Sequence, residues 1–156
     1  MPLKPNTGTS NAKTRPIGVV VVTHGGLALE LVRTARSVLG TLPNVVAVAI
    51  EGTESTLRIK KKIAEAMKRV DRGSGIIILT DMMGGTATNL SLEVARRARG
   101  EVLAGVNLPI LIKLGTLRIG EARHLVRTLR IHGQRQIIEA SPLLEKRLKR
   151  SNQVQQ

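Results

Sequence analysis

Four apolar runs, rich in β-branched residues, recur along the chain, and an amphipathic segment follows each of the first three. The runs are IGVVVVT (17–23), VVAVAI (45–50), GIIILT (75–80) and EVLAGV (101–106). Apolar residues follow one another directly instead of alternating with polar ones, which is typical of a strand buried on both faces of a parallel sheet. Parallel strands need crossover connections, so the chain is predicted to be an α/β protein with a doubly wound, mostly parallel sheet and helices on both faces.

Apolar residues at helical spacing fill the segments between the runs. They predict helices over 27–39, 56–70, 86–98 and a long region from Pro109 to about Ile131. In the second of these helices, Leu57, Ile63, Ala64, Met67 and Val70 are expected on the buried side. The third helix is expected to take Thr86 or Thr88 as its N-cap.

A fifth, more polar strand is predicted at a sheet edge, over QRQIIEA (134–140), after His132 and Gly133 end the long helical region. The common order for such a sheet is 2-1-3-4, with the fifth strand at the edge. This order places the first and third strands side by side at the topological switch point. Ligands of doubly wound sheets bind at the carboxyl ends of the strands at this point.

The length of 156 residues suits one domain. Residues 1–15 lack apolar periodicity and are predicted to be a flexible basic tail, the domain is expected over 16–140, and 141–156 form a basic C-terminal extension. The absence of cysteine excludes disulfides and thiolate chemistry. The apolar runs are shorter than the roughly 20 residues of a membrane span, and the N-terminus lacks the apolar core of a signal peptide. We therefore expect a cytoplasmic protein.

The formal net charge of +14 raises the question of a nucleic-acid partner. However, the excess of Lys and Arg is spread along the chain, as on a solvated surface. The chain also contains no Phe, Tyr or Trp that could stack on bases. We therefore do not expect nucleic acid as a partner.

Two polar residues follow the two strands expected at the switch point. His24 follows the first strand and Asp81 follows the third, so their side chains are predicted to meet. A carboxylate bonded to one ring N–H of an imidazole fixes the tautomer and leaves the other nitrogen free as a nucleophile. Taken alone, His24 would be read as a loop residue and Asp81 as a turn or capping residue.

Gly84, Gly85 and Thr86 open the helix that follows Asp81. The free backbone N–H groups at such a helix start, together with the helix dipole, favour an anion. The combination of nucleophile, carboxylate and glycine-rich helix start predicts a site for a phosphoryl group.

Other motifs are missing. The chain has no G-x-G-x-x-G, no G-x-x-x-x-G-K-[ST] and no G-x-S-x-G. His124 and His132 fall in the last helical region, where exposure or a favourable contact with the helix dipole explains them. No group of His, Asp and Glu has metal-ligand spacing. Neither a metal nor another cofactor is therefore expected.

Three segments, VVVVTHGGLALELV, GIIILTDMMGGTATNLS and EVLAGVNLPILIK, occur in an order and spacing that are specific. Over about residues 16–140 the chain resembles the enzyme IIA component of the mannose family (mannose/fructose/sorbose) of the bacterial phosphoenolpyruvate:sugar phosphotransferase system. The resemblance implies a phosphotransferase in which His24 accepts a phosphoryl group from the phosphocarrier HPr and passes it to a histidine of enzyme IIB in sugar uptake. It also implies that Asp81 hydrogen-bonds His24 and that Gly84, Gly85 and Thr86 bind the phosphate.

The resemblance further implies a homodimer, in which the segment 134–140 can pair with the sister subunit, and contact with the membrane only through a permease complex. Many family members carry an aromatic residue after the His-Gly pair and in the aspartate loop, where this chain has Gly26, Met82 and Met83. Two alternatives stay open. One is a regulatory protein in which phosphorylation of His24 switches a partner, and the other is a dihydroxyacetone-kinase phosphotransfer subunit.

Overall fold

The computed structural model describes residues 15–117 and 119–144. The predicted tail, apart from Arg15, and the predicted extension beyond Leu144 lie outside the described residues. The elements, in chain order, are β1 (Gly18–His24), α1 (Leu27–Leu39), β2 (Val45–Ile50), α2 (Thr56–Val70), β3 (Ile76–Thr80), α3 (Thr86–Ala98), β4 (Glu101–Ala104), α4 (Leu108–Leu114) and α5 (Ala122–Arg135).

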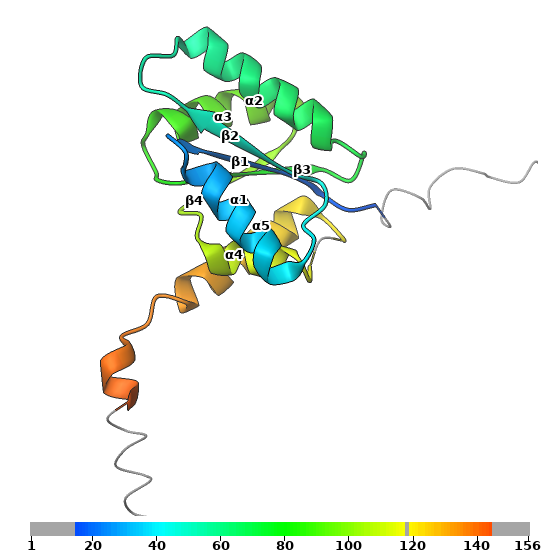
Figure 1. Ribbon diagram of the computed structural model, residues 1–156. Coiled ribbons are helices and arrows are strands. Elements are labelled where there is room, and N and C mark those ends of the chain that lie inside the picture. Colours follow the sequence, from blue (N-terminus) through cyan, green and yellow to red (C-terminus); the bar gives the residue numbers. More distant parts are fainter. Residues whose placement is uncertain (1–14, 118, 145–156) are drawn as a thin grey trace, which may run out of the picture.

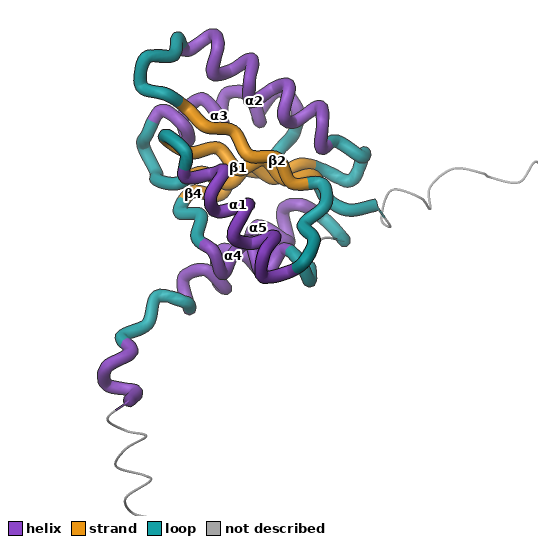
Figure 2. Tube along the Cα trace, in the orientation of Figure 1, coloured by secondary structure: helices purple, strands orange, loops and turns teal. Residues whose placement is uncertain are grey.

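The four strands form one parallel sheet in the order β2-β1-β3-β4, which confirms the predicted order. Helices α2 and α3 cover one face, and α1, α4 and α5 cover the other (Figures 1 and 2). Because β1 lies between β2 and β3, the carboxyl ends of β1 and β3 are neighbours. This placement brings the loops after these two strands together.

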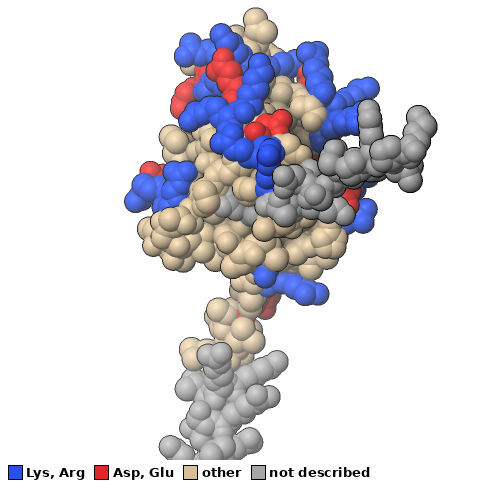
Figure 3. Space-filling model, turned by 90° about the vertical axis from the view of Figure 1, so that its right-hand side faces the viewer, with Lys and Arg blue, Asp and Glu red and all other residues tan. Residues whose placement is uncertain are grey.

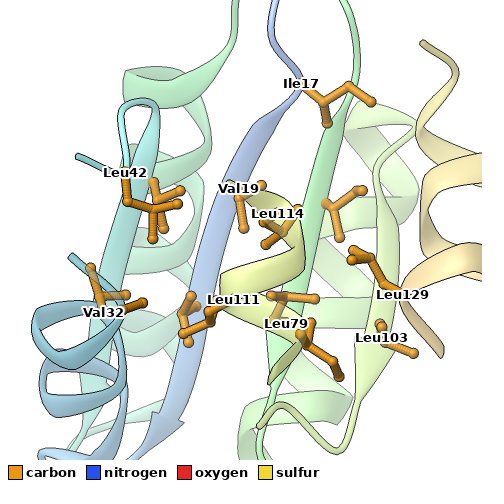
Figure 4. Packing of buried hydrophobic residues seen from close by; sticks show 14 of the residues in the cluster. Ile17, Val19, Val32, Leu42, Leu79, Leu103, Leu111, Leu114 and Leu129 are labelled. Carbon is orange, nitrogen blue, oxygen red and sulfur yellow. The ribbon is translucent and has the colours of Figure 1, made fainter. Parts of the chain in front are cut away.

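Both faces of the central strands are buried, as their continuous apolar sequences predict. Val19 and Val21 belong to the cluster under α1, α4 and α5 (Figure 4), whereas Val20 and Val22 belong to the cluster under α2 and α3. Successive side chains of a strand point to opposite faces, so each run contributes to both clusters. Without aromatic rings, the two clusters consist of aliphatic side chains and methionine.

The predicted long helix over 109–131 is wrong, because the structure divides this region into α4 and α5. Gly133 does not end α5. It is buried inside the helix, and a Cβ added to it would lie 2.6 Å from Cδ1 of Ile110. Gly133 therefore allows α5 to approach α4 closely, and α5 continues to Arg135.

The fifth strand predicted over 134–140 is also wrong for this chain. Residues 134 and 135 form the end of α5, residues 136–139 have no regular structure, and residues 140–144 are helical. The sheet of the described residues has four strands. The pattern of residues 134–140 is compatible with a strand, but a strand also needs a partner beside it, and a local pattern does not contain that information.

Leu57 is 79% exposed, which corrects its predicted place on the buried side of α2. The helix is rotated so that it buries Ile59 and Ala66 together with Ile63, Met67 and Val70. Leu57 lies in the first turn of α2, beyond the part of the helix that packs on the sheet.

The outer edge of β2 is covered by two cationic side chains. Arg36 donates a hydrogen bond to the carbonyl of Val45 at 3.1 Å, and Lys62 donates one to the carbonyl of Ala49. In a parallel strand, alternate residues turn their backbone groups outward, so these carbonyls belong to the edge that faces away from β1. Charged side chains at an edge oppose pairing with another strand.

Candidate functional site

His24 is the last residue of β1, and the turn after it holds its backbone in place. Gly25 adopts φ 53°, a left-handed conformation that glycine takes readily, and its N–H donates to the carbonyl of Ile50 at 2.9 Å. The hydroxyl of Thr23 accepts a hydrogen bond from the N–H of Ala28 at 2.7 Å, which ties the first turn of α1 to β1. The His24 side chain, in contrast, is 46% exposed and accessible to a partner.

Asp81 follows β3 and contacts His24 twice, as the sequence predicts. Its Oδ2 accepts a hydrogen bond from the backbone N–H of His24 at 2.9 Å and lies 2.8 Å from Nδ1 of the ring. Its Oδ1 accepts a hydrogen bond from the N–H of Met82 at 2.9 Å. The carboxylate is therefore held from both sides.

Burial raises the pKa of Asp81, but the hydrogen bonds from the backbone and ring of His24 and from the N–H of Met82 outweigh it. The net result is a pKa below the ordinary value of an aspartate. An ionised carboxylate can only accept hydrogen bonds, so Nδ1 of His24 is the donor. In the neutral ring, Nε2 then carries the free lone pair.

The backbone at the start of α3 lies against the imidazole of His24. A Cβ added to Gly85 would be 3.0 Å from Cε1 and 3.6 Å from Nε2 of the ring. Gly85 is the N-cap of α3, and its carbonyl accepts a hydrogen bond from the N–H of Asn89 at 3.0 Å. The amides of the three residues before Asn89 form the positive end of the helix dipole, and this helix start borders the ring at Gly85.

The expected N-cap at Thr86 or Thr88 is wrong, because Gly85 takes that position without a side-chain bond. Thr88 is instead buried and braces the aspartate loop. Its hydroxyl donates to the carbonyl of Met82 at 2.6 Å and lies 2.6 Å from the hydroxyl of Thr80. A hydroxyl has one proton to donate, so Thr80 is the donor in the second bond. The bracing role of Thr80 and Thr88 was not predicted from the sequence, although a threonine at the end of a buried strand is a signal for such a role.

The other histidines lie elsewhere. His124 and His132 belong to α5, on the face opposite to α2 and α3, and the structure does not bring them to His24. Among residues 15–117 and 119–144, no three His, Asp or Glu side chains are grouped so that they could hold a metal ion. None of the helices in the same residues combines the length and the apolar character that a membrane span needs.

Comparisons with known proteins identify the family. The model of the family EIIA-man, described as "PTS system fructose IIA component", matches residues 18–126. The chain is 30% identical over 139 residues to a PTS system fructose-specific EIIA component of Bacillus subtilis, covering 88% of this chain and 94% of the relative.

Two further likenesses agree. The chain is 32% identical over 98 residues to the PTS system mannose-specific EIIAB component of Escherichia coli, covering 62% of this chain but only 30% of that longer protein. A mannose/sorbose specific IIA subunit from Enterococcus faecalis has the same fold, with a TM-score of 0.73 at 21% identity over 80% of this chain and 95% of that chain. The chain therefore belongs to the mannose family of IIA components of the phosphotransferase system.

Proposed function

We propose that His24 accepts a phosphoryl group on Nε2 from an HPr-like phosphocarrier and passes it to a histidine of an enzyme IIB partner in sugar uptake. The contact between Asp81 Oδ2 and His24 Nδ1 at 2.8 Å carries this proposal. It holds the proton on Nδ1 and leaves Nε2 free as the nucleophile. Family membership supports the same role.

In the first step, the lone pair of Nε2 attacks the phosphorus atom of the phosphorylated carrier. The new N–P bond forms while the bond to the carrier breaks, and the carrier leaves with the bonding electron pair. The ring of His24, now substituted on Nε2 and still protonated on Nδ1, carries a positive charge next to the phosphate. The ionised Asp81 stabilises that charge. The second step is the same exchange in the opposite direction, with a histidine of the IIB partner as the nucleophile.

The start of α3 supplies the phosphate-binding surface, with Gly84, Gly85 and Thr86 as its residues. The transferred group has a loose transition state with charge on its equatorial oxygens, so fixed amide donors lower the barrier without covalent chemistry. A side chain at position 85 would occupy the space next to the ring. The bare backbone of Gly85 therefore leaves room for the phosphoryl group.

A homodimer is part of the same proposal. Beyond α5 the chain exposes Ile137 (83%), Ile138 (58%) and Leu144 (59%), an apolar sequence that a second copy could cover. Light scattering on the full chain tests this. A dimer that dissociates in the Ile137→Asp/Ile138→Asp variant supports the proposal, and a wild-type monomer at the highest soluble concentration contradicts it.

The histidine assignment is tested by incubating the chain with phosphorylated HPr and measuring acid-labile phosphate on the protein. The His24→Ala variant is expected to take up none. The matched control is His124→Ala, which removes an exposed histidine of α5 and should behave like the wild type. Normal uptake by His24→Ala would overturn the assignment.

Onward transfer distinguishes a relay from a switch. Phosphorylated wild-type chain is mixed with a IIB protein, and the phosphate on each protein is followed with time. Movement of the label to IIB supports the relay. Phosphate that stays on His24 in the presence of several IIB proteins supports the regulatory alternative instead.

A further inference from the structure

A groove lies between α2 and α3, away from the phosphotransfer site. It encloses about 580 Å³, within the range of small-molecule sites. Its lining follows one side of α2 from Leu57 in the first turn to Asp71 at the C-cap, and adds the second half of α3 from Glu93 to Ala98. The groove shares no lining residue with the His24 site.

The floor of the groove is apolar. Met67 and Ile76 lie at its base and are 3% and 5% exposed, and Ala64, Val94 and Ala98 complete the walls. The small side chains of the two alanines leave space that larger residues would fill. The thioether of Met67 is flexible and adapts to the shape of an apolar ligand. This floor suits an alkyl chain.

Cations dominate the rim. Four of the lining residues, Lys60, Lys61, Lys68 and Arg97, are basic, against Asp71 and Glu93. Lys60 forms an ion pair with Glu93 across the groove. Lys61 forms one with Glu65 on its own helix, with 3.9 Å between Nζ and Oε1. On the face shown in Figure 3, Lys and Arg side chains gather over the upper layer of the molecule, where α2 and α3 lie.

Lys68 and Arg97 differ from the other two cations. Neither forms an ion pair with any residue in the part of the chain that the structure describes. Both belong to the last turns of their helices, which run side by side, so the two charges lie at the same end of the groove. An anion placed there would meet two cations that have no ion pair among these residues. Of the two carboxylates that line the groove, Glu93 is paired with Lys60, and Asp71 is the C-cap of α2.

We propose that this groove binds a free long-chain carboxylate. The carboxylate lies between Lys68 and Arg97, and the alkyl chain runs over Met67 and Ala64 toward Leu57. From residue 57 to residue 68, α2 rises about 16 Å, which accommodates an extended alkyl chain. The exposed Leu57 then covers the far end of that chain. A concave cavity with its two cations that lack an ion pair at one end fits a single amphiphilic molecule better than the flat surface of a bilayer.

Calorimetric titration of the unphosphorylated full chain with dodecanoate, below its micelle concentration, tests the proposal. Binding of one molecule per chain is expected. Decanoate, with two methylene groups fewer, should bind about tenfold more weakly, because burial of each methylene contributes a few-fold to affinity. Dodecyltrimethylammonium has the same alkyl chain with the opposite charge and should not bind.

Variants separate the charge from the apolar floor. Lys68→Glu/Arg97→Glu is expected to weaken dodecanoate binding by about tenfold or more. The matched control, Arg127→Glu/Arg130→Glu, changes the net charge equally on exposed positions of α5 and should bind like the wild type. Ala64→Leu narrows the groove from its wall and should weaken binding while the charges stay. Circular dichroism establishes that each variant is folded.

Four results would overturn the proposal. These are no binding of dodecanoate, equal binding of the cationic amphiphile, equal binding by the Lys68/Arg97 variant and its control, or binding only to vesicles of anionic phospholipid. The titration is repeated with His24→Ala, which cannot carry phosphate on that residue. Its outcome is therefore independent of the proposed phosphotransfer.

Discussion

The loops after β1 and β3 start alike and are built for different tasks. In each, a fully buried threonine of the strand, Thr23 or Thr80, is followed by one polar residue, His24 or Asp81, and then by two glycines before a helix. In the first loop, Thr23 binds the N–H of Ala28 and ties down the start of α1. In the second loop, Thr80 donates to the hydroxyl of Thr88, which donates to the carbonyl of Met82, and the start of α3 has no side-chain cap.

The difference shows how the carboxyl ends of two neighbouring strands can meet two different requirements. In the proposed phosphotransfer, the nucleophile needs a fixed backbone and an accessible ring, and the short first loop gives His24 both. The proposed phosphate site needs amide donors that no side chain occupies, and the uncapped start of α3 after the second loop meets that need. Met82 and Met83, which are 57% and 73% exposed, lie in the second loop only. The second loop thus also offers an apolar surface to a partner beside the ring.

Replacing Asp81 by asparagine is expected to have the largest effect. The amide is uncharged and can donate as well as accept, so it neither fixes the proton on Nδ1 nor stabilises the phosphorylated ring. Changes to a residue that orients a reactive imidazole cost about 10- to 100-fold in activity, and we expect the upper end for the rate of phosphorylation by HPr. Rapid-quench measurements with labelled HPr test this.

The control for that variant is Asp71→Asn, which changes an exposed aspartate at the C-terminus of α2 and should leave the rate unchanged. Equal rates for Asp81→Asn and Asp71→Asn would show that the second loop contributes no catalytic carboxylate.

The glycines of the two loops should respond differently to alanine. In Gly85→Ala the new Cβ meets Cε1 of His24 at 3.0 Å, so the ring must shift away from its position on Asp81. A displaced nucleophile loses orientation, and we expect a roughly tenfold lower rate of phosphorylation. In Gly26→Ala the new Cβ meets nothing within 4 Å in the described part of the chain, at an ordinary φ of −78°, and the rate should stay within about twofold. A larger loss for Gly26→Ala would reverse the comparison.

The sheet and the central pair of the site could be predicted from the sequence because both depend on local patterns. Runs such as VVVV mark strands buried on both faces, and the switch-point rule then places His24 beside Asp81. The role of Gly133 could not be predicted, because the side chain that leaves no room for a Cβ there belongs to Ile110 on another helix. The same holds for Thr88, since its hydrogen-bond partners are Thr80 at the end of β3 and Met82 in the loop, which only the folded chain brings to it.

The two buried threonines should differ in their effect on stability. Thr23→Val leaves the buried N–H of Ala28 without its acceptor, which costs about 1–3 kcal/mol in the free energy of unfolding. Thr80→Val removes a donor, but the Thr88 hydroxyl keeps its bond to Met82, so the expected cost is about 1 kcal/mol. Urea unfolding of both variants tests the order. A larger loss for Thr80→Val would show that the second loop, and not the first, is the more tightly held.

The smallest expected effect is a dependence of stability on acid. The pKa of Asp81 is lowered in the folded chain, so its ionised form stabilises the fold above the ordinary aspartate pKa of about 4. This contribution is lost as the pH falls through the lowered pKa. The difference in stability between the wild type and Asp81→Asn should therefore narrow as the pH falls below about 4. A constant difference across this range, measured by urea unfolding, would contradict the assigned direction.

The two cationic side chains on the outer edge of β2 also limit how copies of this chain can assemble. Arg36 and Lys62 occupy outward carbonyls of β2, so an added strand would have to displace them, whereas β4 forms the other end of the sheet. A protein with two open sheet ends can polymerise as a ribbon, but one with a single open end stops growing once that end is paired. In the proposed homodimer, the contact is the apolar segment beyond α5, so the guarded edge of β2 offers no strand for a third copy to pair with. The guarded edge thus favours a finite pair over a fibre.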